Sequence, residues 1–240
     1  LDAVDFLSPL VPAYKISSGD LNFTQLLERV ASTGKPMIVS TGMASKLEVH
    51  QAITTITEAW SNFSISSELC LLHCVSSYPA PLDQVNLSCL ETLSEFGFPV
   101  GYSDHTLGIN ACLTAVALGA QVIEKHFTIS HSYSDFRDHQ LSANPSELKS
   151  LVTSIREVEQ LKGQNIKKVT PSEELSRTSM RRSLCANHDL PANHVIDRAD
   201  LISLRPGNGF PPNKISELIG RVTTVPLSSG DMIKKDHINN

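Results

Sequence analysis

Residues 69–127 read LCLLHCVSSYPAPLDQVNLSCLETLSEFGFPVGYSDHTLGINACLTAVALGAQVIEKHF, and this stretch decides the fold. Three short apolar runs, at 69–75, 100–103 and 122–127, alternate with stretches whose apolar residues have helical spacing. A buried strand followed by an amphipathic helix, several times over, is typical of a parallel sheet with helical crossovers. The stretch therefore predicts a parallel α/β fold.

The same alternation continues on both sides of this stretch. Two more apolar runs precede it, at Ala13–Ser17 and Met37–Ser40. Helices are expected over Phe23–Ser32, Lys46–Trp60, Leu87–Phe96, Asn110–Leu118 and Ser146–Leu161. These make five β/α units, whereas a closed (β/α)₈ barrel has eight. Residues 1–10 are expected to be the end of a preceding helix, so the chain is expected to begin within a fold.

The composition changes after residue 163. Residues 164–182 are polar and basic, which predicts a linker. From residue 183 onward the helical period is lost, and short runs interrupted by Pro and Gly predict strands at Ser183–Ala186, Leu201–Leu204 and Val222–Val225. We therefore expect an α/β domain over 1–163, a linker over 164–182 and a small β-rich domain over 183–240.

Composition and charge exclude several classes of protein. The 240 residues carry a formal net charge of −5, so there is no basic field to bind nucleic acid. No apolar stretch reaches the ~20 residues that cross a bilayer, so we expect no membrane contact. The five cysteines include no CxxC pair. We interpret them as reduced thiols, which predicts a cytoplasmic protein.

Polar side chains gather where each predicted strand ends. Because the carboxyl ends of parallel strands meet at one edge of a sheet, these side chains are expected to form one site. The residues are Lys15, Ser18 and Asp20 after the first run, Ser76 and Tyr78 after the third, Ser103 and His105 at the fourth, and Glu124 and His126 at the fifth.

The pattern leaves two interpretations open for the charged residues. His105 and His126 end adjacent strands, and two neutral imidazoles suit a divalent metal ion; each is also typical of a hydrogen-bonded structural histidine. Glu124 shares a strand face with His126, which suits a general base or ligand, although an ion pair with Lys15 is the simpler interpretation. Lys15 and the nearby serines provide donors for a phosphate, but serine alone is common in turns.

Two further observations bear on function. Asp138 lies in a polar loop after the last strand, where it would bind a sugar hydroxyl or be solvated. The chain lacks the GxGxxG and GxxxxGK[ST] motifs, which argues against dinucleotide and P-loop chemistry.

The motifs KISSGD, IVSTGM, LLHCVSSYPAPLDQVNL, GYSDHTLG, VIEKHFT and DHQLS resemble, in order, the barrel of the N-acetylneuraminate (sialic acid) synthase family. The segment DLISLRPGNGFPPNKISELIGR resembles that family's antifreeze-like (SAF) domain. The resemblance implies a TIM-type (β/α)₈ barrel that lacks about three N-terminal β/α units, followed by a SAF domain. The resemblance therefore implies that the chain is a fragment of such a synthase, and it leaves open whether this chain is active alone.

The resemblance also implies an activity and its residues. The family condenses phosphoenolpyruvate with an N-acetylmannosamine-like amino-hexose to a nine-carbon ulosonic acid and releases phosphate, using a divalent ion, commonly Mn²⁺, with Mg²⁺ or Co²⁺ as alternatives. It implies a domain-swapped homodimer. By position, the implied roles are metal binding by His105 and His126; phosphate binding by Lys15, Ser18, Ser76 and Ser103; a catalytic role for Glu124 beside the metal water; and sugar contact by Tyr78, Asp20, Asp138 and, from the other subunit, Arg205.

Two departures and three alternatives accompany the resemblance. Ser76 stands where some members have Asn, and Asp20 where some have Glu. In the first alternative the acceptor is a diamino sugar, and the enzyme is a legionaminic or pseudaminic acid synthase. A related phosphoenolpyruvate aldol synthase is less consistent with the RPGNG segment. A non-catalytic carbohydrate-binding fragment would not need all the strand-end polar residues.

Overall fold

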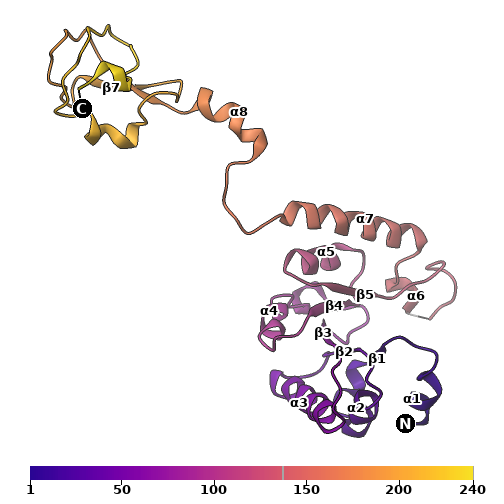
Figure 1. The fold of residues 1–240 in the computed structure, drawn as a ribbon. Coiled ribbons are helices and arrows are strands. Elements are labelled where there is room, and N and C mark those ends of the chain that lie inside the picture. Colours follow the sequence, from indigo (N-terminus) through magenta and orange to yellow (C-terminus); the bar gives the residue numbers. More distant parts are fainter. Residues whose placement is uncertain (137, 240) are drawn as a thin grey trace. The chain divides into compact units, whose positions relative to one another are not determined.

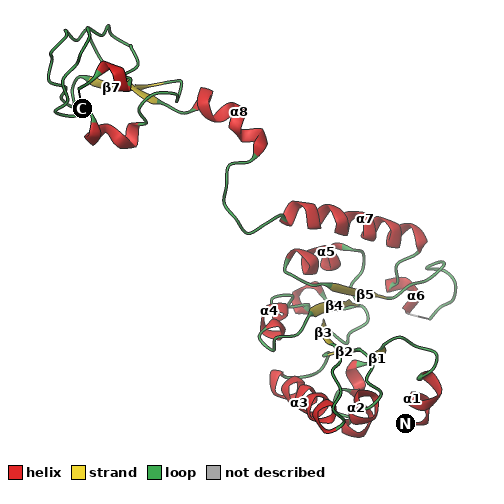
Figure 2. Ribbon diagram, in the orientation of Figure 1, coloured by secondary structure: helices red, strands yellow, loops and turns green. Residues whose placement is uncertain are grey.

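The computed structural model describes residues 1–136 and 138–239. Contacts divide the chain into two units, Leu1–Gln164 and Asn165–Asn240, each described by itself below. Figure 1 shows the chain coloured along its sequence, and Figure 2 shows its helices and strands. No helix in the described part of the chain is both long and apolar enough to cross a membrane.

The five apolar runs form one parallel sheet in the order β1-β2-β3-β4-β5. The strands are β1 (Tyr14–Ile16), β2 (Met37–Ser40), β3 (Leu69–Cys74), β4 (Val100–Asp104) and β5 (Val122–Lys125). Each strand pairs with the next in the sequence, as short right-handed crossovers require. The predicted parallel α/β class is confirmed.

The sheet is strongly curled. Four strand spacings separate β1 from β5, which is about 19 Å in a flat sheet. Yet Lys15 Nζ of β1 lies 3.4 Å from Glu124 Oε1 of β5. A lysine and a glutamate side chain cannot bridge a flat sheet of that width, so β1 and β5 curve toward each other. This curvature is that of a partial (β/α) barrel with its polar side chains inside.

Helices lie outside the sheet, and all but the first come after a strand in the chain (Figure 2). They are α1 (Asp2–Leu7), α2 (Thr24–Ala31), α3 (Lys46–Asn62), α4 (Cys89–Ser94), α5 (Asn110–Ala117), α6 (Asp138–Leu141) and α7 (Pro145–Lys162), with 3₁₀ turns η1 (Ser18–Asp20) and η2 (Leu82–Gln84). The sequence around α3 explains where this helix begins, because Ser45 and Glu48 form a capping box at its start. Its buried residues then recur at helical spacing and face the sheet.

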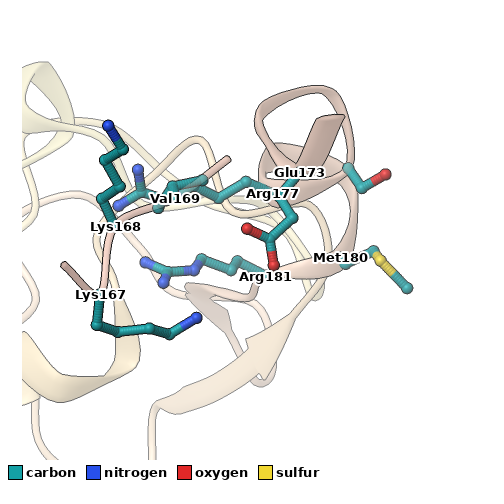
Figure 3. Close-up of a pocket in the computed structure, with 8 residues that line it drawn as sticks. Lys167, Lys168, Val169, Glu173, Arg177, Met180 and Arg181 are labelled. Atoms are coloured by element: carbon teal, nitrogen blue, oxygen red, sulfur yellow. The ribbon is translucent and has the colours of Figure 1, made fainter. Parts of the chain in front are cut away.

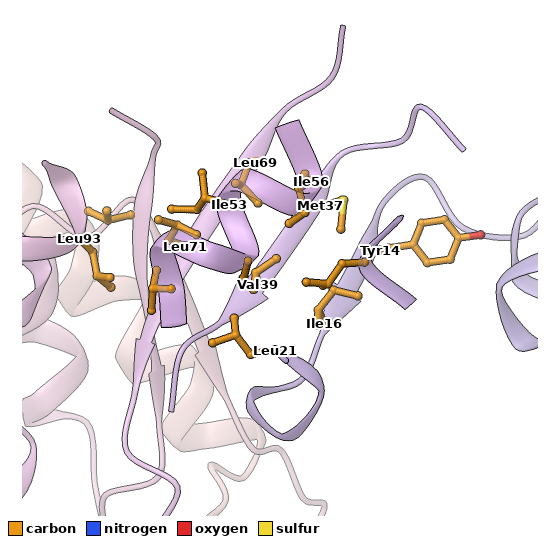
Figure 4. Packing of buried hydrophobic residues seen from close by; sticks show 14 of the residues in the cluster. Tyr14, Ile16, Leu21, Met37, Val39, Ile53, Ile56, Leu69, Leu71 and Leu93 are labelled. Carbon is orange, nitrogen blue, oxygen red and sulfur yellow. The ribbon is translucent and has the colours of Figure 1, made fainter. Parts of the chain in front are cut away.

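The core of the first unit lies between the sheet and these helices. Ile53 and Ile56 of α3 pack beside Val39 and Leu71, which point outward from β2 and β3 (Figure 4). Each of these side chains is less than a tenth exposed. Burying an aliphatic side chain of this size stabilises the fold by about 1.5–3 kcal/mol, so the outward residues anchor the strands and leave the inward ones free for chemistry.

The second unit is small and mostly irregular. It contains α8 (Pro171–Met180), β6 (Ser183–Ala186), β7 (Leu201–Leu204), η3 (Pro212–Glu217) and η4 (Lys235–His237). The strands β6 and β7 pair antiparallel. Its core consists of Leu184, Ala186, Leu190, Leu218, Leu227 and Ile233.

Two predictions for this part of the chain differ from the structure. The strand expected at Val222–Val225 is wrong: the segment forms only isolated bridges, Val195 with Val222 and Thr223 with Ile238. The segment 164–182, expected to be a linker, contains α8 and groups with the second unit from Asn165 onward.

Candidate functional site

Strand register places the predicted polar residues on the inner face of the curled sheet. Cys74, Ser103 and Glu124 are register partners on three neighbouring strands, so their side chains share one face. Residues two further along, His105 and His126, point to the same side. Lys15 joins this group from the opposite edge through Glu124.

One half of the site is built around the carboxylate of Glu124. Ser103 Oγ donates a hydrogen bond of 2.6 Å to Glu124 Oε1, and Lys15 Nζ lies 3.4 Å from the same oxygen. The ion-pair interpretation of Lys15 and Glu124 is thus confirmed. A hydroxyl and an ammonium group converge on one negatively charged oxygen.

The second polar cluster lies where β1 and β2 end. The backbone N–H of Gly42 donates to Ser18 Oγ over 3.0 Å. A Cβ placed on Gly42 would lie 2.4 Å from Ser76 Oγ and 2.8 Å from Ser18 Oγ. Only glycine therefore lets these two hydroxyls approach the same stretch of backbone.

The two strand-end histidines meet. The ring centroids of His105 and His126 are 5.3 Å apart, with an angle of 68° between the planes. His105 Nδ1 lies 2.8 Å from the carbonyl oxygen of Val75. Because a carbonyl only accepts, Nδ1 carries the proton, and Nε2 keeps its lone pair in the neutral ring.

Burial and neighbouring groups set the protonation of this cluster. Burial and the nearby His105 both lower the pKa of His126. Burial alone would lower the pKa of His105, but hydrogen bonding to the Cys74 thiol and the Val75 carbonyl outweighs it and raises this pKa. Burial would raise the pKa of Cys74, but its contacts with His105 and two serine hydroxyls hold the thiol pKa below its usual range.

Tyr78 and Asp138 border the histidine pair. The Tyr78 ring centroid lies 4.2 Å from that of His105 and 5.8 Å from that of His126. Asp138 Oδ2, at the start of α6, lies 4.0 Å from His126 Nδ1. An aromatic ring and a carboxylate beside two imidazoles can contact the apolar face and the hydroxyls of a sugar.

The donor set fits a divalent metal ion with open coordination positions. His105 donates its Nδ1 proton to a backbone carbonyl, as metal-bound histidines commonly do, and so directs Nε2 toward a ligand. Among residues 1–136 and 138–239, no group of three or more His, Cys, Asp or Glu side chains is arranged to hold a metal ion. Two imidazoles would therefore leave the remaining positions to water and substrate.

Three polar residues are not brought into this cluster by any hydrogen bond described. Asp20 Oδ2 accepts from Ser17 Oγ over 2.6 Å, at the surface. His73, the third strand-end histidine, points to the outer face and bonds through Nε2 to the Val85 carbonyl over 2.7 Å. Arg205 lies in the second unit, whose placement relative to the site is not described.

Cys74, Gly42 and Ser40 stand at strand ends in the sequence, but the sequence analysis assigned none of them a role in the site. Cys74 Sγ lies 3.7 Å from His105 Nδ1. Ser40 Oγ is buried and has no hydrogen-bond partner among the described residues, and alternation along β2 places it on the inner face. Ser40 and Cys74 are the last residues of β2 and β3, and Gly42 lies two residues beyond β2, but their contacts follow only from how the neighbouring strands are placed.

A second concave surface lies in the other unit. Helix α8 and the chain before it enclose a pocket lined on one side by cations (Figure 3). Arg177 pairs with Glu174 over 3.5 Å. The other lining cations are Lys167, Lys168 and Arg181.

Known proteins resemble the chain over nearly its whole length. Residues 1–167 match the NeuB family and residues 181–239 match the SAF domain. An N,N'-diacetyllegionaminic acid synthase of Legionella pneumophila is 44% identical over 98% of this chain and 66% of its own length. The human N-acetylneuraminate-9-phosphate synthase is 34% identical over 99% of this chain and 66% of its own length.

A solved structure agrees with these matches. It is an N-acetylneuraminic acid synthetase from Leptospira borgpetersenii in complex with citrate. It superimposes with a TM-score of 0.68 at 37% identity, over 73% of this chain and 60% of that one. The present chain thus spans about two thirds of the length of the curated relatives. The curled sheet, its inward polar residues and these matches agree: the chain belongs to the NeuB family and carries a SAF domain.

Proposed function

We propose that this chain is the catalytic part of a sialic-acid-type synthase. Such an enzyme condenses phosphoenolpyruvate with an N-acetylmannosamine-like amino-hexose to a nine-carbon ulosonic acid and releases phosphate. The observation that carries the proposal is the meeting of two polar half-sites on one inner sheet face. Ser103 joins Glu124 in one half, and the ring of His105 meets that of His126 edge to face in the other.

The first half-site suits the phosphoryl group of phosphoenolpyruvate. Glu124 already holds a negatively charged oxygen between Lys15 and Ser103. A phosphate oxygen would take the same donors, and Ser18 and Ser76 extend the set of hydroxyls. Lys15 would then neutralise charge on the phosphate as the C–O bond breaks.

The second half-site suits the acceptor sugar. His105 and His126 would hold Mn²⁺, with Mg²⁺ or Co²⁺ as alternatives, and such an ion polarises an aldehyde as a Lewis acid when bound. Tyr78 offers its ring, and Asp138 its carboxylate, to the sugar.

The reaction proceeds in three steps. The enol carbon of phosphoenolpyruvate forms a bond to the aldehyde carbon, and the aldehyde oxygen takes up a proton from solvent water. A second water adds to the cationic carbon left behind, and one of its protons passes to Glu124 as general base, which returns it to solvent. The C–O bond to phosphate then breaks, the new hydroxyl gives its proton to the leaving phosphate, and a ketone is left.

The test is phosphate release from phosphoenolpyruvate in the presence of Mn²⁺ and a panel of acceptors. The panel contains N-acetylmannosamine, its 6-phosphate and diacetamido hexoses, because legionaminic and pseudaminic acid synthases would differ in the acceptor. We expect His126→Ala to abolish release and to keep the thermal transition. The control is His50→Ala, on the exposed side of α3, which should release phosphate normally. Unchanged release in His126→Ala would contradict the metal assignment.

We further propose that the enzyme is a cytoplasmic homodimer in which Arg205 reaches the partner's sugar site. The five cysteines are all free, which suits a reducing compartment. Mixing Arg205→Ala with His126→Ala chains tests the exchange, because a mixed dimer keeps one complete site. We expect roughly a quarter of the wild-type rate after mixing and none from either variant alone. A mixture that stays inactive would show that Arg205 does not act across the dimer.

A further inference from the structure

A buried ion pair lies directly behind the two histidines. Asp104 precedes His105 and Lys125 precedes His126, and the two are the last register partners of β4 and β5. Their side chains are 0% and 3% exposed, and Lys125 Nζ lies 2.7 Å from Asp104 Oδ2. Alternation along each strand places this pair on the outer face and the histidines on the inner face.

The donors described around the carboxylate of Asp104 come from β4 itself, the turn after β4, β5 and helix α5. Asp104 Oδ1 accepts from the Tyr102 hydroxyl over 3.0 Å and from the Thr106 backbone N–H over 2.8 Å. Asp104 Oδ2 accepts from the Cys112 thiol of α5 over 3.1 Å, as well as from Lys125.

Lys125 closes the ring of hydrogen bonds from the other strand. Its Nζ also donates to the Thr106 carbonyl over 2.9 Å. The residues on both sides of His105 are therefore tied to Lys125, the residue before His126. Among the residues that the structure describes, the β4–β5 ladder ends at Asp104 and Lys125, so these side-chain bonds continue the connection between the two strands at the end of the ladder.

Stability alone is a weak reason for such a pair. Replacing a buried ion pair by neutral residues of similar volume is often neutral or stabilising, because both charges lose their hydration on folding. The pair does, however, restrict geometry, because each oxygen has two fixed donors.

We propose that Asp104 and Lys125 are a positioning pair that holds His105 and His126 at the separation and orientation of a shared metal site. Neither side chain touches substrate or metal. This inference rests on the proposed function in one respect, namely that the two imidazoles bind a metal ion. The placement of the rings can be measured without any metal.

The experiment uses the full chain with the double substitution Asp104→Asn and Lys125→Met. Asn keeps an acceptor for Tyr102 and Thr106, and neither new side chain is charged, so we expect the fold to persist. In histidine-labelled, metal-free protein we expect ring-proton NOEs between His105 and His126 in the wild type and their loss in the double variant. Mn²⁺ titration should then show about tenfold weaker binding.

One matched control and one fallback variant make the result decisive. Lys46→Met with Glu95→Gln removes an exposed ion pair of α3 and should leave both measurements unchanged. Should the double variant not fold, Tyr102→Phe, which removes one donor to Asp104 Oδ1 and keeps both charges, gives the same readouts with a shift of about two- to threefold in the Mn²⁺ Kd.

The outcomes separate this inference from the catalytic proposal. Loss of the NOEs in the double variant supports the positioning pair even if the chain releases no phosphate. Wild-type NOEs together with a wild-type Mn²⁺ affinity in the double variant would overturn it.

Discussion

Gly42 shows at the scale of one residue how backbone space shapes the site. Its missing Cβ leaves room for Ser76 Oγ and Ser18 Oγ, which would lie 2.4 and 2.8 Å from that atom. We expect Gly42→Ala to fold, because the two nearest obstructing atoms are rotatable hydroxyls and the third, Ser18 Cβ at 3.2 Å, needs to shift only slightly. We expect it to raise the KM for phosphoenolpyruvate about tenfold. Steady-state phosphate release measures this.

Gly19→Ala is the matched control for that substitution. Gly19 lies between Ser18 and Asp20, and a Cβ there would meet no atom within 4 Å. Its KM should stay at the wild-type value. A wild-type KM for phosphoenolpyruvate in Gly42→Ala would show that the two hydroxyls take no part in binding the substrate.

The same residues explain how much of the site is predictable. The sequence predicts His105, His126, Lys15 and Glu124, because charged and titratable side chains at strand ends are conspicuous. It does not predict Gly42 or Cys74. Their importance depends on which atoms of neighbouring strands lie beside them, and that follows only from register and curvature.

At the scale of an element, the start of α7 is tied to the end of β5. Asn144 Oδ1 accepts from the Glu147 N–H over 3.0 Å, and Glu147 Oε2 accepts from the Asn144 N–H over 2.9 Å. The adjoining Ala143 N–H donates to the His126 carbonyl over 2.7 Å.

We expect Asn144→Ala to destabilise the first unit by about 1 kcal/mol through loss of this cap. The thermal transition should fall by roughly 2–4 °C. Thr153→Ala, in the middle of the same helix, removes only a bond to the Lys149 carbonyl and should not lower it. A transition in Asn144→Ala at the wild-type temperature would exclude a contribution from the cap.

Elements with strong periodicity were predictable and others were not. The helix expected over Lys46–Trp60 is α3, two residues longer at its end. Helix α8 escaped prediction because its polar sequence has no apolar face, although Thr170 and Glu173 form a capping box. The strand expected at Val222–Val225 failed because pairing depends on distant partners, which propensity does not specify.

At the scale of the whole molecule, each unit has its own hydrophobic core. The number of β/α units followed from the residue pattern, and the curl of the sheet was implied by the family resemblance; the structure confirms it where Lys15 and Glu124 meet across the sheet. Separate cores allow separate unfolding transitions. Substitutions in one unit should therefore leave the other unit's transition in place.

Asp200 allows this independence to be tested through pH. Its carboxylate accepts from the Asp197 N–H over 2.8 Å and lies 2.7 Å from His194 Nε2. Burial would raise the pKa of Asp200, but these two hydrogen bonds outweigh it and lower the pKa. A lowered pKa in the folded state stabilises the second unit above the unfolded value of about 3.9, and the contribution is lost as the pH falls below it.

We therefore expect Asp200→Asn to destabilise the second unit by about 1–2 kcal/mol at pH 7. We also expect the variant to lose less stability than the wild type between about pH 5 and pH 3, because this range brackets the ordinary carboxyl pKa of about 3.9. Hydrogen exchange resolved by peptide measures residues 165–240 separately from residues 1–164. Asp236→Asn, whose side chain is 81% exposed, is the control and should change neither unit. Equal destabilisation of both units by Asp200→Asn would mean that they unfold together, contrary to the separate cores.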